Sequence, residues 1–376
     1  MRRAVCLVLM LVFFCGGGVA AHAADYDLSG QLDAAGADEL MDELPGDARY
    51  LLEENGVTAI DYGQLLALSP GEFLRTVWGL VLERVKLPLA AFASVLGIVL
   101  LCALLDALKT SLWEGNLSTV FAAVSVVCVA AAIVNPIVNC IADTARSIHD
   151  CANFIVSFIP VFASVVTVGG QAVTATTYTA FLFAACQVVS QVVSQMLVPL
   201  MGIYLAFCIV GNLAPGVNVG AVAKVVKSVV SWALGLLLTL FVGLLSLQTM
   251  VAAGGDTVAS RTAKFLIGSF VPVVGGALSD AFSATQGYLR LLKTTVGVFG
   301  ILVALLTFLP VFLQTTLWYL TVNVAAAVSE MLEVRPVADI LKSSGAALGI
   351  LIAVILCFAL LVIISTSLVL MVATGA

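Results

Sequence analysis

The chain has 376 residues, of which 62% are hydrophobic and only 10% charged, and its formal net charge is −6 at pH 7. A soluble domain could not bury so much apolar surface, and an acidic chain is poorly suited to binding nucleic-acid phosphates. Several uncharged apolar stretches reach about 18 residues or more, which is the signature of transmembrane helices. The predicted fold class is an all-α polytopic membrane protein with six to eight transmembrane helices.

Residues 1–23 have the features of a cleaved signal peptide. Arg2 and Arg3 form a positive n-region, residues 4–14 form an apolar core, and Ala-His-Ala at 21–23 is a small-residue cleavage site. We therefore expect the mature N-terminus to be extracytoplasmic.

Residues 24–87 form a strongly acidic segment, with thirteen of the 22 acidic residues and four of the sixteen basic ones. We expect a few short helices here. Ser69 as N-cap, Pro70 at the first helical position and Glu72 two residues further predict the start of the best of them. Its apolar stripe indicates either an amphipathic helix on the outer membrane surface or an extension of the first span.

Residues 88–376 form the predicted multispan membrane domain. Its long apolar windows are 89–108, 117–138, 178–210, 229–251, 296–322 and 346–372. The window 178–210 would be about 50 Å long as one helix, so it must tilt, kink at Pro199 or split. Two shorter windows, 154–168 and 265–278, are interrupted by proline and flanked by glycine pairs.

Basic residues in short loops predict the orientation of the spans. Lys109, Lys224, Lys227 and Lys342 each stand next to a span, so we place them in the cytoplasm. The charges of residues 143–146 and 256–264 then fall on the external side.

The most unusual stretch is 255–293, which surrounds a short apolar centre with charges. Irregular backbone at membrane depth is tolerated only where it is buried in protein or lines a watery cavity, and charges there often mark a pathway. We interpret it as a re-entrant segment; a surface loop between two spans is the alternative. The candidate pore or coupling residues are Asp256, Arg261, Lys264, Pro272, Gly275, Gly276, Asp280, Arg290 and Lys293.

The two interrupted windows align with each other, which predicts an internal duplication. The alignment places Pro160 on Pro272, and a glycine pair follows each window, at 169–170 and 275–276. The predicted repeat units are about 109–222 and 227–338, followed by a terminal helix at 343–374, with one Pro/Gly-broken re-entrant segment in each unit. Paired broken helices of this kind are typical of transporters and channels.

Three glutamines, Gln187, Gln191 and Gln195, follow one another at a spacing of four residues and form one polar helix face. This face indicates either the lining of an aqueous path or hydrogen bonds between helices.

Enzymatic chemistry has little support in the sequence. His149 is the single histidine of the mature chain, and HExxH, GxSxG and GxxxxGK[ST] motifs are absent. We predict no catalytic, cofactor-binding or metal-binding residues, no cofactor, and no enzyme activity. Cys140 and Cys151 flank a predicted external loop and are the one candidate pair for a disulfide.

The run GDTVASRTAKFLIGSFVPVVGGALSDAF, from position 255 to 282, closely resembles the stage III sporulation protein AE family of endospore-forming bacteria. The resemblance covers about residues 90–376 and is strongest from 231 to 322. The matching positions of the family pattern are Asp256, Arg261–Phe265, Pro272–Gly276, Ser279 and Asp280.

The resemblance implies a multi-pass subunit of the channel or secretion complex that links mother cell and forespore. It implies location in the mother-cell membrane around the forespore. It also implies other stage III sporulation membrane proteins as partners, including ring-forming components and a separate ATPase. Homo-oligomerisation is a further possibility, and nucleic acid is not an expected partner. A secondary transporter of a small solute and a purely structural scaffold are the alternative functions.

Overall fold

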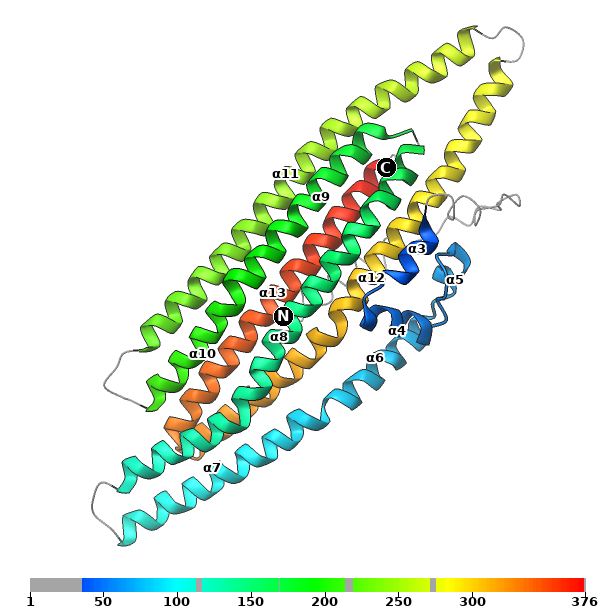
Figure 1. Ribbon diagram of the computed structural model, residues 1–376. Helices are drawn as coiled ribbons and strands as arrows, with labels where there is room; N and C mark the ends of the chain where they lie inside the picture. The colour runs from blue at the N-terminus through cyan, green and yellow to red at the C-terminus, as the bar shows by residue number, and fades with distance from the viewer. Residues whose placement is uncertain (1–35, 113–116, 169, 214–218, 271–274, 375–376) are drawn as a thin grey trace.

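The computed structural model of the protein describes residues 36–112, 117–168, 170–213, 219–270 and 275–374. Over these residues every regular element is a helix, and together they form an elongated bundle (Figure 1). The long helices are α7 (Lys86–Leu112), α8 (Leu117–Val168), α9 (Ala172–Val192), α10 (Val198–Leu213), α11 (Val219–Phe270), α12 (Gly275–Met331) and α13 (Arg335–Thr374). A short π-helix, η1 (Val193–Leu197), joins α9 to α10.

Six helices in the described part of the chain are long and apolar enough to cross a membrane. Their candidate spans are Pro70–Leu104, Ala123–Val168, Ala172–Val192, Lys224–Leu247, Leu289–Met331 and Arg335–Ser367. The predicted fold class, an all-α polytopic membrane protein, is therefore confirmed.

The ends of the helices lie at two opposite poles of the bundle (Figure 1). The connections α7–α8, α10–α11 and α12–α13 lie at one pole, which we call the basal pole. The connections α8–α9 and α11–α12 lie at the opposite, distal pole. Lys224, Lys227 and Lys342 are exposed near the basal pole, and Lys109 is in the last turn of α7. The four lysines that the sequence places on one side of the membrane thus lie at one end of the molecule.

Two of the helices are far longer than a bilayer requires. α8 has 52 residues and α12 has 57, so they extend for about 78 Å and about 86 Å at 1.5 Å per residue. The hydrocarbon core of a bilayer is about 30 Å thick. The bundle must therefore project well beyond the membrane on at least one side.

The predicted break at Pro160 is wrong, and the predicted break at Pro272 lies outside the described residues. α8 runs without interruption through Pro136 and Pro160 to Val168, because neighbouring helices and side chains can compensate for the backbone bond that proline removes in a membrane helix. In the second copy α11 ends at Phe270 and α12 starts at Gly275. The first copy turns at Gly170, ten residues after Pro160, whereas in the second copy Pro272 lies between the two helices, outside the described residues.

The α8–α9 turn shows why a glycine is needed at this position. Gly170 has φ 79°, a left-handed conformation that glycine adopts without steric cost. Its N–H donates to the carbonyl of Thr167 at 2.9 Å, and the N–H of Gln171 donates to that of Val166 at 3.3 Å. This pair of bonds is a Schellman motif, which terminates α8 and reverses the chain.

The core of the bundle lies where α8, α9, α12 and α13 meet. Its centre is a stack of aromatic rings from Phe154, Phe158, Phe162 and Tyr178, with successive centroids 5.7, 5.4 and 5.2 Å apart. All four side chains are buried. The hydroxyl of Tyr178 lies 3.3 Å from that of Thr366 on α13, so the polar tip of the ring is paired within the core.

The N-terminal segment folds against the side of the bundle. It contains the short helices α3 (Ala37–Asp42), α4 (Gly46–Glu54) and α5 (Tyr62–Ala67), and then α6 (Pro70–Arg84). Leu40, Leu51 and Leu52 are each about 1% exposed, and α4 packs on α12 while α3 packs on α8. α6 leads directly into α7 (Figure 1), so it extends the first span, the second of the two arrangements that the sequence allows.

Candidate functional site

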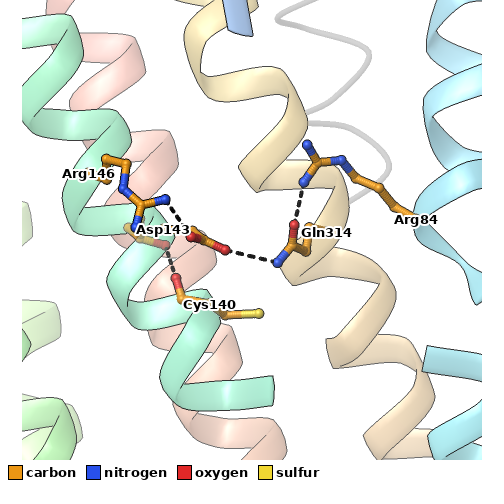
Figure 2. Close-up of polar contacts among 6 residues, drawn as sticks. Arg84, Cys140, Asp143, Arg146 and Gln314 are labelled. Atoms are coloured by element: carbon orange, nitrogen blue, oxygen red, sulfur yellow. Dashed lines mark hydrogen bonds and ion pairs between the residues drawn. The ribbon is translucent and has the colours of Figure 1, made fainter. Parts of the chain in front are cut away.

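A chain of polar contacts crosses the apolar bundle between α6, α12 and α8 (Figure 2). Gln314 on α12 is at its centre: its Oε1 accepts a hydrogen bond from Nη1 of Arg84 on α6. Its Nε2 donates to Oδ2 of Asp143 on α8 at 3.1 Å. The other carboxylate oxygen, Oδ1, accepts a bond from Nη1 of Arg146 at 3.2 Å. We call these four residues the polar cluster.

Each member of the polar cluster is placed by its position on a helix. Asp143 and Arg146 are three residues apart and therefore lie on one face of α8. Arg84 is in the last turn of α6. Gln314 is an uncharged donor and acceptor in an otherwise apolar stretch of α12. Its amide joins a cation on one helix to an anion on another without adding a charge of its own.

The strength of these contacts depends on their exposure. The side chain of Asp143 is 33% exposed and that of Arg146 is 70% exposed, so solvent screens this ion pair and it contributes at most about 1 kcal/mol. The Gln314 contacts are partly buried. Hydrogen bonds to charged groups typically contribute about 1.5–3 kcal/mol when shielded. The Gln314 amide is therefore the main energetic link between the three helices.

The polar cluster lies at different distances from the basal ends of its helices. Asp143 is about 39 Å from the start of α8, Gln314 about 26 Å from the end of α12, and Arg84 about 42 Å from the end of α7, at 1.5 Å per residue. Because these side chains contact one another, the three helices end at different heights at the basal pole. The distances are comparable with the thickness of a bilayer, about 30–45 Å.

Lys293 is the one predicted site residue whose side chain makes a described contact with the first copy. It is only 3% exposed, and its Nζ donates to Oε1 of Gln171 at 3.0 Å. Gln171 directly follows the glycine turn between α8 and α9. The bond therefore joins α12 to the turn of the first predicted repeat. Arg290, one helical turn earlier, is exposed.

The other predicted pore or coupling residues are placed only by the helices that carry them. Asp256, Arg261 and Lys264 lie in the distal part of α11, and Gly275, Gly276 and Asp280 lie in the first turns of α12. Pro272 lies outside the described residues. In Figure 1 these two helix ends extend beyond their neighbours as a distal hairpin. They stay candidates by position alone.

The three glutamines do not line the interior of a single chain. Gln187 and Gln191 are on α9 and Gln195 is in η1, and all three are exposed on one outward face. The predicted polar face exists, and it is directed away from the centre of the bundle.

The disulfide considered between Cys140 and Cys151 is wrong. Both thiols are free and buried, and both belong to α8. Eleven residues of one helix separate their Cα atoms by about 16 Å, whereas a disulfide requires less than about 7 Å.

Sequence reasoning missed Arg84, Gln314 and the Lys293–Gln171 bond. Gln314 did carry a signal, because it is the one strongly polar side chain in the apolar window 296–322. A lone amide at such a depth is costly without a partner. Its partners, however, are 171 and 230 residues away along the chain, and no spacing rule indicates them.

A bundle of six membrane-length apolar helices, closed by interhelical packing and polar contacts, defines a polytopic α-helical membrane protein. Within that class the chain belongs to the stage III sporulation protein AE family, whose model matches residues 57–375. The stage III sporulation protein AE of Bacillus subtilis (strain 168) is similar, with 24% identity over 235 residues. That match covers 62% of this chain and 59% of the relative, so the chain spans about three-fifths of the relative's length. No solved structure matches the chain.

Proposed function

We propose that this protein is a membrane-embedded, non-enzymatic subunit of a sporulation-specific channel or secretion complex that links mother cell and forespore. The observation that carries the proposal is a bundle about twice as long as a bilayer is thick in a protein of a sporulation family. A subunit that only had to cross one membrane would not need such long helices. A subunit that extends from one membrane toward a second, closely opposed membrane would need them.

The distribution of charge supports a membrane around the basal half. Residues 117–142 of α8, 294–329 of α12 and 343–374 of α13 contain no charged side chain. Charges appear at the basal pole below these stretches. They appear again at the polar cluster and beyond it, at His149, Asp150 and Arg290.

The N-terminal segment supports the same arrangement. Its charged residues Glu39, Asp42 and Asp47 are exposed on helices that pack beside α8 and α12. Such a polar, acidic unit is costly to place in hydrocarbon. With the basal lysines in the cytoplasm, the mature N-terminus and the distal half of the bundle are extracytoplasmic, and the protein is in the mother-cell membrane that surrounds the forespore.

The packed centre of the bundle bears on how such a subunit works. The aromatic rings from Phe154 to Tyr178 fill the space between α8 and α9. A path for solute would therefore run between subunits. The partners we propose are other stage III sporulation membrane proteins, including ring-forming components, and a separate ATPase, since the chain has no nucleotide-binding motif of its own. Nucleic acid is not among them.

The function is tested in the sporulating host by deletion of the gene and by recovery of the tagged full-length protein. We expect normal vegetative growth, a severe loss of heat-resistant spores, and co-purification of other stage III membrane proteins with the tagged chain from sporulating cells. Normal spore yield after deletion would overturn the proposal. Spore loss without any co-purifying protein would favour a solute transporter that acts alone.

The orientation is tested with a matched pair of variants that each add one cysteine to the chain. Asp280→Cys is at the distal pole, and Lys342→Cys is at the basal pole. A membrane-impermeant thiol reagent added from outside should label the first and spare the second, with the unsubstituted chain as background. The reverse pattern would place the N-terminus in the cytoplasm and remove the basis for the proposed location.

A further inference from the structure

The outward face of α9, η1 and α10 is a continuous surface with unusual properties. Its exposed positions recur every three or four residues along the helices: Thr176, Ala180, Ala184, Gln187, Gln191, Gln195, Pro199, Gly202, Ala206 and Val210. Val188, Met196 and Ile203 flank this stripe and are each about half exposed. We call this surface the glutamine face.

We propose that the glutamine face is the surface through which two copies of this chain associate side by side in the membrane. The α9–η1–α10 segments of the two copies lie parallel to each other. They are related by a two-fold axis that runs along the bundle. In this arrangement each residue meets its own copy at the same height. A glutamine amide is both donor and acceptor, so Gln187, Gln191 and Gln195 can each bond their counterparts.

Charge supports a second copy as the occupant of this face. Residues 172–213 contain no charged side chain, so two identical faces can approach without like-charge repulsion. Another widely exposed helix, α11, differs in this respect. Lys224 and Lys227 are exposed on it, and a two-fold contact there would bring lysines of the same sign together.

Side-chain size supports close contact between the two copies. Ala180 and Ala184 precede the glutamines on the face, and Gly202 and Ala206 follow them. A Cβ atom built on Gly202 would meet nothing within 4 Å, so this surface is open in the single chain. Small residues at such positions let helix backbones approach closely, which is the usual basis of helix association in membranes.

The size of the face matches that of a stable interface. From Ala172 to Leu213 the three helices have 42 residues, which gives a strip about 63 Å long and about 12 Å wide. The resulting area of about 750 Å² is close to the roughly 800 Å² that each partner contributes to an interface of standard size.

Lipid covers only part of this strip. The ring of Tyr178 contacts that of Phe162, which lies about 28 Å distal to Asp143 along α8. Gln187 is about 14 Å back from Tyr178 along α9, so it lies about 15 Å beyond the polar cluster, which marks the proposed membrane surface. Val173 and Phe183 lie beyond that height and are still 50% and 45% exposed. Exposed apolar side chains that lipid does not reach indicate a protein partner. The height assignment rests on the proposed placement of the membrane, whereas the charge, size and area arguments do not.

The first test is cysteine crosslinking of the full-length protein in native membranes. Gln191→Cys places a thiol on the proposed axis. The matched control is Trp232→Cys on α11. It lies at a similar height, because Phe241 of α11 contacts Phe181 of α9 and each position is nine or ten residues on the basal side of that contact. The side chain of Trp232 is 68% exposed. With the unsubstituted chain as background, mild oxidation should give a disulfide-linked dimer with Gln191→Cys and not with Trp232→Cys. Equal dimer yields, or no dimer with Gln191→Cys, would overturn the proposal.

The second test measures mass in lipid nanodiscs. We expect twice the mass of one chain for the wild type. The variant with Gln187, Gln191 and Gln195 all changed to leucine should dissociate about tenfold to hundredfold more readily, since bonds between membrane helices contribute modestly but add together. A monomeric wild type, or an unchanged dimer in the triple variant, would contradict the proposal. A crosslink from Gln191→Cys to a protein of different mass would assign the face to another partner. Spore yield is measured separately, so failure of this interface leaves the proposed function open to its own test.

Discussion

The helices at the centre of the bundle and those at its edge have similar apolar sequences and very different surroundings. In α12 and α13, 61% of the most apolar window is buried inside the protein; the corresponding share is 17% for the α6–α7 span and 11% for α11. Hydropathy therefore identifies the helices without telling which contact protein and which contact lipid. That distinction depends on particular residues, above all on the glycines.

Glycines show the difference between the two regions most directly. On α12, a Cβ atom added to Gly297 would lie 2.5 Å from Leu370, and one added to Gly300 would lie 2.4 Å from the ring of Phe158. On α11, a Cβ atom at Gly235 or Gly243 would meet nothing within 4 Å. The central glycines are needed for close helix contact, and the edge glycines are free of that constraint within a single chain.

The largest expected contrast is between two aromatic truncations. Phe162→Ala removes a fully buried ring from the aromatic stack, and we expect a loss of about 3–5 kcal/mol in the free energy of unfolding. Trp232→Ala removes a ring that is 68% exposed on α11, and its effect should be close to zero. Thermal unfolding in detergent measures both. Equal losses would show that α11 is packed as tightly as the centre.

The second contrast uses the same substitution at two glycines. Gly300→Ala forces the ring of Phe158 to move, and overpacking of this kind costs about 1–3 kcal/mol. Gly243→Ala has open space and a better helix former, so we expect unchanged or slightly raised stability. The measurement is the midpoint of thermal unfolding for each variant. A stable Gly300→Ala protein would mean that α8 and α12 are less tightly packed than described.

The next prediction concerns the buried lysine. Gln171→Leu removes one acceptor from the Lys293 ammonium, which is 3% exposed. We expect a loss of about 1.5–3 kcal/mol, the usual contribution of a hydrogen bond to a charged group. Gln171→Glu keeps an acceptor at this position and should retain most of the stability. If both variants behave like wild type, this bond does not hold the α8–α9 turn on α12.

The smallest effects are expected in the polar cluster, where solvent is nearer. Gln314→Leu breaks the link between Arg84 and Asp143. We expect about 1.5 kcal/mol of destabilisation, the lower end of the range for hydrogen bonds to charged groups, with earlier proteolysis of the N-terminal segment. Arg146→Ala removes only the exposed ion pair and should change stability by less than about 1 kcal/mol. Limited proteolysis of the two variants, followed with time, compares them. A larger effect for Arg146→Ala would reverse the assigned order.

The class of fold was predictable because it depends on local properties. Apolar runs and the absence of charge identify membrane helices, since burying an ionised group in hydrocarbon is costly. The same reasoning placed Lys224 and Lys342 at one end of the molecule. Helix length was less predictable: Pro160 looked like a break, and the helix continues through it, because tertiary contacts outweigh the local preference of one residue.

The polar contacts were the least predictable part of the candidate site. Lys293 was singled out for its charge, and the structure pairs it with Gln171, 122 residues away. The glutamine face was correctly predicted as one polar stripe from the spacing of Gln187, Gln191 and Gln195. Its outward direction was not predictable, because the periodicity of one helix does not indicate which neighbours surround it.

The short connection between α12 and α13 has a consequence for how the protein is made. Only residues 332–334 separate the two helices, and Glu333 adopts φ 60° to close the turn. The pair must therefore enter the membrane together, as one hairpin. Every other long helix packs against one member of this hairpin, and all of them precede it in the chain. The earlier helices are therefore made before their main packing partner, and the bundle can close only after the hairpin has been synthesised.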